Sequence, residues 1–365
     1  MKFVKTEDIK SGMRLARPIY SKKGVLLFDR DTVLSSTSIP SIKNFNLLGI
    51  YVLEPAEPLP PISEEDVEFE RFQTVTVGNI EDELKKISTS HSQSQLEFIV
   101  NNIIKKFGHL DGKINFYQNL RSKEDYVYKH ALNVAILCTM ICNVLNVRVE
   151  ERQQTVRAAL VHDVGKLNYP GESVYGEAED EDELRRLYQV QLNSMSIIEK
   201  ALGSEGTAVK RICTQALRKQ MIMFNLEENN ANMKMHTGAQ ILLVANRYDE
   251  ITAMNLQGTA KSEVKAVREF MEHPEIYDPK VVNALLQSIN VLFPGVSVEL
   301  NTGEKAMVLK ENTDNILRPM VLSFRDNSIL DLSLRIYEDI QVEDIMKTLD
   351  NRYVMDNEAL RRAGF

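Results

Sequence analysis

Two histidines and one aspartate have the residue types and the sequence context of a metal site. His162 and Asp163 are adjacent, near the end of an apolar segment with helical spacing. Both side chains cost free energy when they are buried without partners, whereas imidazole nitrogen and carboxylate oxygen are good ligands for divalent first-row metals. His130 stands at the start of the preceding apolar segment. These three residues therefore predict half of a metal site on neighbouring helices.

The residues that follow this pair extend the predicted chemistry. Gly165 is expected to let the helix end. Lys166 supplies a cation suited to holding a phosphate oxygen or assisting a leaving group. We therefore predict Asp163 and Lys166 as catalytic residues. The alternative, in which the His-Asp pair is only a surface or capping feature, fits the apolar surroundings less well.

The remaining histidines and cysteines have simpler interpretations. Polar, loop or helix-start contexts surround the other histidines: His91, His109, His236 and His273. The three cysteines cannot all pair with one another, and they are expected to be buried small hydrophobic residues: Cys138, Cys142 and Cys213.

Length, composition and net charge limit the classes of protein to which this chain is expected to belong. The chain has 365 residues, enough for two or three domains, and a formal net charge of −8. That charge argues against sequence-independent binding of nucleic acid, which needs surplus Lys and Arg. No apolar run approaches the length of about 18 residues that a membrane span needs, and acidic residues come too early for a signal peptide. We therefore expect a cytoplasmic protein with no membrane or nucleic-acid partner.

The first 119 residues divide at a proline-rich stretch. Residues 1–60 are expected to form a small β-rich domain, with a hairpin turn near Gly24, a short helix over 38–45 and a returning strand over 49–53. The segment 54–61 contains four prolines and reads as a linker. Residues 61–119 are expected to be linker and helices.

From residue 120 to residue 290 the apolar pattern has helical period. Buried helices are expected over residues 131–147, 155–164 and 241–249, and the acidic stretch 177–183 is expected to be a solvated helix start. Residues 291–365 are expected to form a small antiparallel sheet followed by a terminal helix over 342–349. The predicted fold is mainly α, a helical bundle flanked by two small β-rich segments.

Three stretches of this sequence, taken in order, resemble the HD-GYP family. They are residues 125–135, 158–166 and 244–249, and the resemblance covers roughly residues 120–290. That family is a branch of the HD superfamily of metal-dependent phosphohydrolases, with an HD-type helical bundle. Its active members hydrolyse cyclic di-GMP with two or three metals, often iron or manganese.

The resemblance implies a role for several positions. His130, His162 and Asp163 match metal ligands of the family, and Lys166 matches its lysine. Asn246 stands where the family has a ligating aspartate. Asp249 matches a second aspartate three residues later, so it is not expected to replace that ligand.

Other expected ligands are missing. The family histidine after the acidic stretch aligns with Gln191, and paired histidines are absent from residues 215–221, where Ala216 and Leu217 stand. The Gly-Tyr-Pro signature is also absent from residues 224–230. The resemblance therefore implies one divalent metal (iron, manganese or zinc) on His130, His162, Asp163 and Asn246, and no binuclear centre. A neutral amide in place of a carboxylate is expected to weaken even that site.

The sequence leaves two principal functions open. One is a degenerate HD-GYP-like signalling protein with weak or absent hydrolysis, which binds a cyclic dinucleotide, another phosphorylated small molecule or a protein partner. The other is an active single-metal phosphohydrolase that acts on a different phosphate ester or nucleotide. We favour the first, because the loss of several ligands together suggests that the chemistry was released. A scaffold for oligomerisation is a third possibility.

Overall fold

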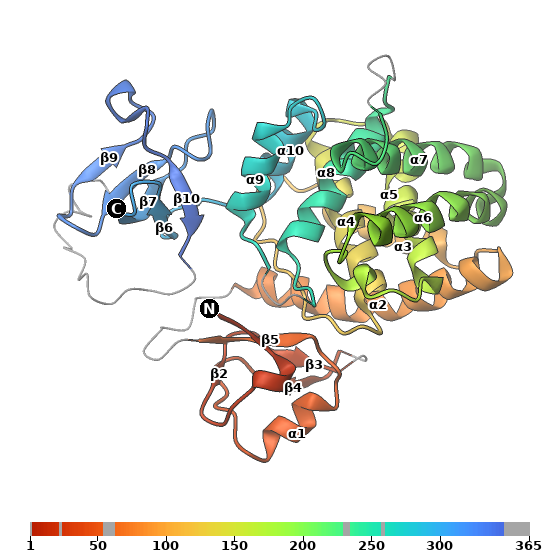
Figure 1. The fold of residues 1–365 in the computed structure, drawn as a ribbon, viewed down its shortest axis with the longest axis horizontal. Helices are drawn as coiled ribbons and strands as arrows, with labels where there is room; N and C mark the ends of the chain where they lie inside the picture. The colour runs from red at the N-terminus through yellow and green to blue at the C-terminus, as the bar shows by residue number, and fades with distance from the viewer. Residues whose placement is uncertain (1, 22–23, 54–62, 229–233, 257–259, 347–365) are drawn as a thin grey trace.

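The computed structural model describes residues 2–21, 24–53, 63–228, 234–256 and 260–346. It contains a large helical domain with a small β-rich module below it and a five-stranded sheet to one side (Figure 1). This is the predicted fold class, mainly α with small β-rich segments at both ends. The proline-rich stretch 54–61 lies outside the described residues.

The N-terminal module holds two small sheets and one helix. A three-stranded antiparallel sheet has the order β1-β5-β2, and β3 pairs with β4 in a separate hairpin. Its elements are β1 (Lys2–Lys5), β2 (Arg14–Leu15), β3 (Ile19–Tyr20), β4 (Leu26–Phe28), α1 (Ser38–Lys43) and β5 (Gly49–Leu53). The apolar run from Leu15 to Tyr20 is split between two sheets because Pro18 cannot donate a ladder hydrogen bond.

The helical domain is built from nine helices in the described residues. They are α2 (Glu64–Ser90), α3 (Leu96–Phe107), α4 (Tyr126–Val144), α5 (Val149–Val161), α6 (Glu181–Leu202), α7 (Gly206–Met223), α8 (Thr237–Thr252), α9 (Glu263–Glu272) and α10 (Pro279–Ser288). Two 3₁₀ turns, η2 (Val164–Asn168) and η3 (Glu172–Tyr175), connect α5 to α6. Helix α4 contacts α2, α3, α5, α8 and α10, so it forms the centre of the domain.

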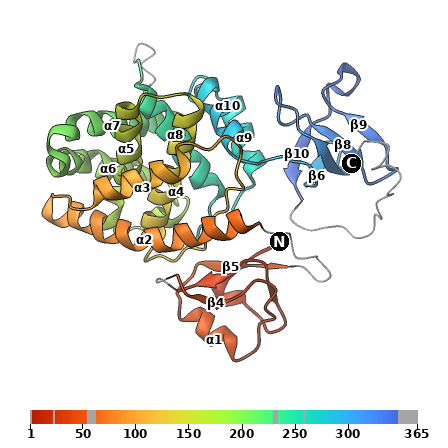
Figure 2. The same ribbon diagram turned by 180° about the vertical axis from the view of Figure 1, so that it is seen from behind.

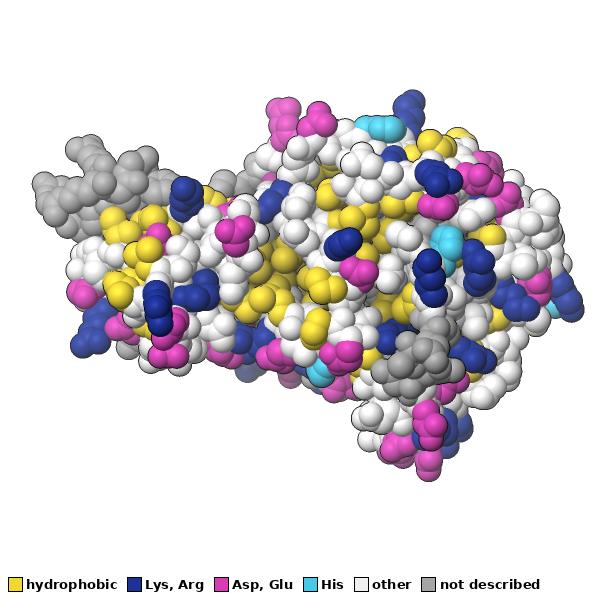
Figure 3. Space-filling model, turned by 90° about the horizontal axis from the view of Figure 1, so that it is seen from above, with side chains coloured by type: hydrophobic (Ala, Val, Ile, Leu, Met, Phe, Trp, Pro, Cys, Tyr) yellow, Lys and Arg dark blue, Asp and Glu magenta, His cyan; other side chains and the backbone are white. Residues whose placement is uncertain are grey.

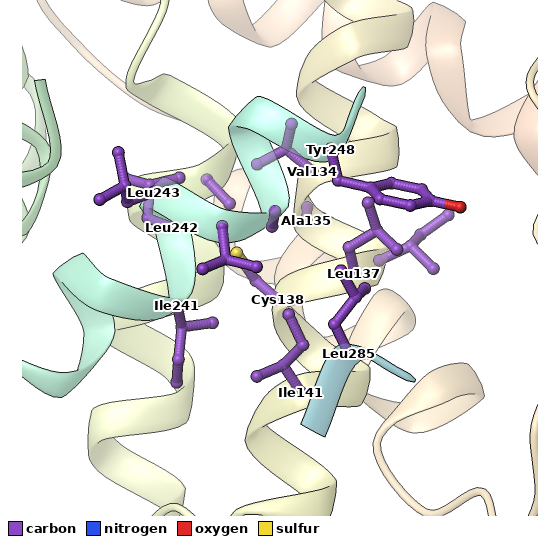
Figure 4. Close-up of a cluster of buried hydrophobic side chains, with 14 of the residues drawn as sticks. Val134, Ala135, Leu137, Cys138, Ile141, Ile241, Leu242, Leu243, Tyr248 and Leu285 are labelled. Carbon is purple, nitrogen blue, oxygen red and sulfur yellow. The ribbon is translucent and has the colours of Figure 1, made fainter. Parts of the chain in front are cut away.

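The core of this domain lies between α4 and α8. Figure 4 shows Val134, Leu137 and Ile141 of α4 packed with side chains of α8 and with Leu285 of α10. Because these helices are apolar on most sides, they are fixed by close packing. Polar side chains on α4 and α8 are consequently held in defined positions.

Helix α2 separates the N-terminal module from the other helices, as both ribbon views show (Figures 1 and 2). Its start is a capping box, in which the Ser63 hydroxyl accepts from the Asp66 backbone N–H and the Asp66 carboxylate accepts from the Ser63 backbone N–H. The module is also tied to the helical domain through its backbone, because Leu48 N–H donates to Arg121 C=O at 2.8 Å.

The C-terminal sheet is antiparallel with the order β10-β6-β7-β8-β9. Its strands are β6 (Ser297–Leu300), β7 (Lys305–Lys310), β8 (Met320–Ser323), β9 (Ile329–Asp331) and β10 (Val342–Ile345). The predicted helix over 342–349 is therefore wrong for its first four residues, and residues 347–349 lie outside the described part. The spacing of apolar residues there fits a helix, but the open edge of β6 offers backbone groups that pairing satisfies, and Val342 is fully buried against it.

Two details around the predicted site also differ from expectation. The helix predicted over 155–164 begins earlier, at Val149, and ends at Val161, with η2 following. Gly165 lies within η2 and does not end α5. A Cβ at Gly165 would lie 2.8 Å from Ser194 Oγ and 3.1 Å from Gln191 Cα, so the glycine allows η2 to pack closely against α6.

One helix among the described residues, α4, is long and apolar enough to cross a membrane. Most of that helix is buried inside the domain, however, as expected of a core helix. On the face drawn in Figure 3, basic and acidic side chains are interspersed, with apolar side chains gathered between them.

Candidate metal centre

Four predicted ligands from three parts of the chain converge inside the helical domain. His130 comes from the second turn of α4, His162 caps the end of α5, Asp163 follows it, and Asn246 comes from α8. All four are buried. The ligand atoms of His130, His162 and Asp163 lie within 4.8 Å of one another. The structure therefore brings together the residues that the sequence singled out.

The outer hydrogen bonds of the two imidazoles orient them toward this cluster. His130 Nδ1 lies 2.6 Å from Asp249 Oδ2, and His162 Nδ1 lies 2.8 Å from the Ala159 carbonyl oxygen. Both partners are acceptors, so Nδ1 of each neutral ring carries the proton and Nε2 presents a lone pair. Burial lowers the pKa of His162 and outweighs the opposing effect of the Asp163 carboxylate, which favours the neutral ring.

Asn246 contributes a further lone pair. Its amide nitrogen donates to Gln220 Oε1 at 3.1 Å and to Glu250 Oε1 at 3.2 Å. Its Oδ1 lies 2.9 Å from Nε2 of both histidines. Acceptor atoms thus face one another in a buried space, an arrangement that a bound cation stabilises and that is unfavourable without a cation or proton between them.

The distances within the cluster fit one metal ion. His130 Nε2 lies 3.3 Å from His162 Nε2 and 3.3 Å from Asp163 Oδ2. Ligands at about 2.0–2.2 Å from one ion are separated by about 3.0–3.4 Å in octahedral or tetrahedral coordination. Asp163 Oδ2 is buried and faces both His130 Nε2 and the Lys166 ammonium. The donor set therefore fits one divalent metal held by His130, His162, Asp163 and Asn246.

Asp163 is the negative ligand of this set. Burial alone would raise its pKa, but the facing His162, Lys166 and His130 outweigh burial and hold the pKa of that carboxyl well below its usual range. Lys166 Nζ lies 2.6 Å from Asp163 Oδ2 and 4.0 Å from Glu250 Oε1. The two predicted catalytic residues are thus an ion pair at the edge of the cluster.

Asp249, which the resemblance had named without a role, supports His130 from behind, and Arg121, which the sequence analysis missed, pairs with it. Asp249 accepts from the fully buried Arg121 guanidinium at 2.7 and 2.8 Å, and also from Gln118 and Asn133. This charge-assisted network fixes the carboxylate that orients the His130 ring. Asp249 could be found from its place in the third motif. Arg121 could not, because nothing in the sequence around a single arginine in a loop indicates that it is buried.

The space beside Asp163 opposite His130 is small and poor in ligands. Gln191 Nε2 donates to Asp163 Oδ1 at 2.6 Å and so occupies the second carboxylate oxygen. A cavity of about 10 Å³ remains there, and beyond His162, Asp163 and Asn246 of the cluster itself its wall includes Gln191, Ala216 and Leu217. The described residues therefore form one group of His, Cys, Asp and Glu side chains able to hold a metal, the group around His130.

A cavity of about 430 Å³ opens directly onto the cluster. His130, Asp163 and Lys166 lie on its wall, together with Tyr126 and Tyr188. Its volume falls in the range of small-molecule sites, about 300–1,000 Å³. Part of the acidic stretch, expected to be only a solvated helix start, also lines this cavity: Glu177, Asp180 and Glu181.

The other histidines lie elsewhere. His236 is the N-cap of α8, where its Nδ1 accepts from the Gly238 backbone N–H at 3.0 Å. His91 and His273 cap the C-termini of α2 and α9. His109 follows α3, one residue beyond its cap at Gly108.

Comparison with known families agrees with this geometry. The family model for the HD domain matches residues 127–251, the stretch that contains all four converging residues. The chain thus contains an HD domain over residues 127–251, and its sequence resembles the HD-GYP branch of that superfamily. An HD domain implies binding of a divalent metal, and the His130 cluster is a group that could bind it.

Two known proteins are similar to this HD-domain chain. A cyclic di-GMP phosphodiesterase of Pseudomonas aeruginosa is 22% identical over 254 residues, which are 65% of this chain and 56% of that protein. The chain thus spans just over half the length of this relative. An HDGYP protein from Bdellovibrio bacteriovorus aligns in structure with a TM-score of 0.45 and 12% identity, covering 78% of this chain and 97% of that one.

Proposed function

We propose that this protein is a degenerate HD-GYP-like signalling protein of the bacterial cytoplasm, which binds one divalent metal and has weak or absent phosphodiesterase activity. In this proposal it acts by binding a ligand or a protein partner. The observation that carries the proposal is the contrast between the two sides of Asp163. One side holds two imidazoles and Asn246, and the other holds Gln191 and a cavity of about 10 Å³.

The contrast matters because of how two-metal hydrolysis works. Two ions together activate the attacking water and stabilise the leaving oxygen, whereas one ion supplies only part of this. Gln191 donates to the carboxylate oxygen that a second ion would need, and Ala216 and Leu217 offer no ligand atoms. The residues therefore support retention of one metal and loss of rapid hydrolysis.

The ligand we propose is a cyclic dinucleotide or another phosphorylated small molecule. The relative from Pseudomonas aeruginosa is named for its action on cyclic di-GMP. The cavity of about 430 Å³ is large enough for part of such a molecule, and a dication at its base would reverse the local negative charge. Basic and acidic side chains both line its wall. The basic ones are Lys166, Arg247 and Lys261, and the acidic ones are Asp163, Glu177, Asp180, Glu181 and Glu250.

A second function, an active single-metal phosphohydrolase for another phosphate ester or nucleotide, is favoured by one observation. Lys166 Nζ lies on the cavity wall, 2.6 Å from Asp163 Oδ2. In that function the ammonium would hold a phosphate oxygen while the metal, when bound, activates water. Lys166→Gln should abolish turnover under this second function but leave metal content unchanged.

The two functions are separated by measuring metal content, binding and turnover on the same preparation. We expect at most one iron, manganese or zinc per chain by elemental analysis, saturable binding of cyclic di-GMP by calorimetry, and hydrolysis far slower than that of an intact family member. The matched control is His162→Ala, which should lose the metal. Two metals per chain with rapid turnover would refute the proposal, and rapid turnover of another nucleotide with one metal would support the second function.

A further inference from the structure

A second cavity, of about 410 Å³, lies away from the metal centre. We name it the interdomain cavity, because its wall combines the N-terminal module, the middle of α2 and the segment 118–125. Leu48 N–H donates to Arg121 C=O, and Leu47 forms an isolated bridge with Ser122, so backbone hydrogen bonds hold two of its walls together. The cavity is therefore built by the docking of the module on the helical domain.

Two residues on the wall of this cavity carry buried polar atoms without hydrogen-bond partners. Both Asn119 Oδ1 and Asn119 Nδ2 are buried and have no hydrogen-bond partner among the described residues. Glu70 Oε2 is buried and unpartnered too, while Glu70 Oε1 accepts from Arg17 at 2.8 Å. A buried amide or carboxylate without partners costs free energy, so a ligand that satisfies these atoms would stabilise the folded protein.

The same atoms define the chemistry of the ligand. A carboxamide with both atoms free is matched by an edge that has one acceptor and one donor side by side, as in a lactam. Glu70 Oε2 requires a further donor. The described basic residues on the wall, Arg17 and Lys129, are already paired, with Glu70 and with Asp125. These features disfavour an anionic ligand such as a phosphate ester.

We propose that the interdomain cavity is a second binding site, for a small uncharged molecule with a lactam-type donor–acceptor edge that pairs with Asn119 and a hydroxyl or amine that donates to Glu70. The site is distinct from the cavity above the metal centre. Gln118 reaches both regions, because it lines the interdomain cavity and donates to Asp249.

The test uses the full-length protein and three probes with such an edge: uridine, guanosine and 2-pyrrolidone. Ribose, which lacks the edge, is the comparison. At about ten times its dissociation constant, at least one probe should raise the melting temperature by about 2–4 °C, because a ligand stabilises the state that binds it. Ribose should cause no shift. Absence of a shift with all three probes would overturn the proposal.

Two variants locate the binding. Asn119→Leu replaces an unsatisfied amide with an apolar group, so the unliganded protein should be no less stable, yet the shift should disappear. Gly78→Leu projects a side chain from a position on the wall where a Cβ meets no atom within 4 Å, and it should also abolish the shift. The matched control is Gly112→Leu, another glycine whose Cβ meets no atom. A shift retained in Asn119→Leu would place the probe elsewhere and overturn the proposal.

Discussion

Asn246→Asp tests the metal centre most directly, because it changes one ligand atom and the charge of the site. In the metal-free protein the new carboxylate oxygen would replace an amide that now lies 3.2 Å from Glu250 Oε1. Two unit charges at that distance repel by about 5 kcal/mol at an effective dielectric of 20. Lys166 and Arg247, 4.0 and 3.4 Å from Glu250 oxygens, offset part of this. We expect the metal-free variant to be less stable than the wild type.

When manganese is bound, we expect the variant to gain more stability from the metal than the wild type does. A carboxylate ligand adds a full charge at contact distance from a dication, and we expect affinity to rise about 10–100-fold, which is about 1.4–2.7 kcal/mol. The extra stabilisation should appear as a thermal shift on manganese addition that is larger in the variant than in the wild type by about 3–10 °C.

The assay is a thermal melt with and without manganese, paired with a metal titration by calorimetry. Asn143→Asp is the matched control, since it makes the same change on α4, about 20 Å along the helix from His130. The control should leave the manganese shift unchanged. Equal shifts in Asn246→Asp and the wild type would refute the reasoning, since Asn246 would then not face the ion.

Three further predictions concern the surroundings of the site. Gly165→Ala forces a methyl group into the contact between η2 and α6. It should destabilise the protein by about 1–3 kcal/mol in urea titrations and reduce manganese uptake. The control Gly78→Ala, at a position where a Cβ meets no atom within 4 Å, should be neutral or stabilising. Arg121→Met leaves the Asp249 carboxylate buried without its cation and should cost about 3–5 kcal/mol, measured in the same way; a cost under about 1 kcal/mol would contradict this role. Burial raises the pKa of Glu70, so its ionisation lowers stability as pH rises. Glu70→Gln should therefore be more stable than wild type near about pH 7, with the difference vanishing near about pH 4; a difference independent of pH would contradict it.

Much of the helical domain could be predicted because its apolar residues recur with the period of an α-helix, and the structure forms helices there. The nearly all-apolar residues 131–142 are buried at the centre of the bundle in α4, which ends at Val144, whereas the predicted helix extended to residue 147. The strand β10 could not be predicted in this way, since a spacing of apolar residues typical of a helix was overridden by pairing with β6. Local sequence contains no information about an open edge formed some 40 residues earlier.

The candidate site, too, could be predicted from local sequence only in part. His130, His162 and Asp163 carried a signal in their types and spacing, and they lie together in the structure. Arg121 carried none, because its burial depends on Asp249, which is 128 residues away in the chain. The role of Gly165 likewise depends on Ser194, a contact that no local rule for helix ends anticipates.

The charges facing the metal position bear on the proposed function. Asp163 is the one carboxylate among the four converging residues, since Asn246 is neutral and both imidazoles present lone pairs. A dication held by this set keeps about one unit of positive charge, in a buried site where screening is weak. Such a centre attracts a phosphate group from the cavity above it. Gln191 is bonded to the far oxygen of Asp163, and in the proposed function no second ion binds there to turn this attraction into rapid cleavage. The balance of charge thus supports binding of a phosphorylated ligand more strongly than its hydrolysis.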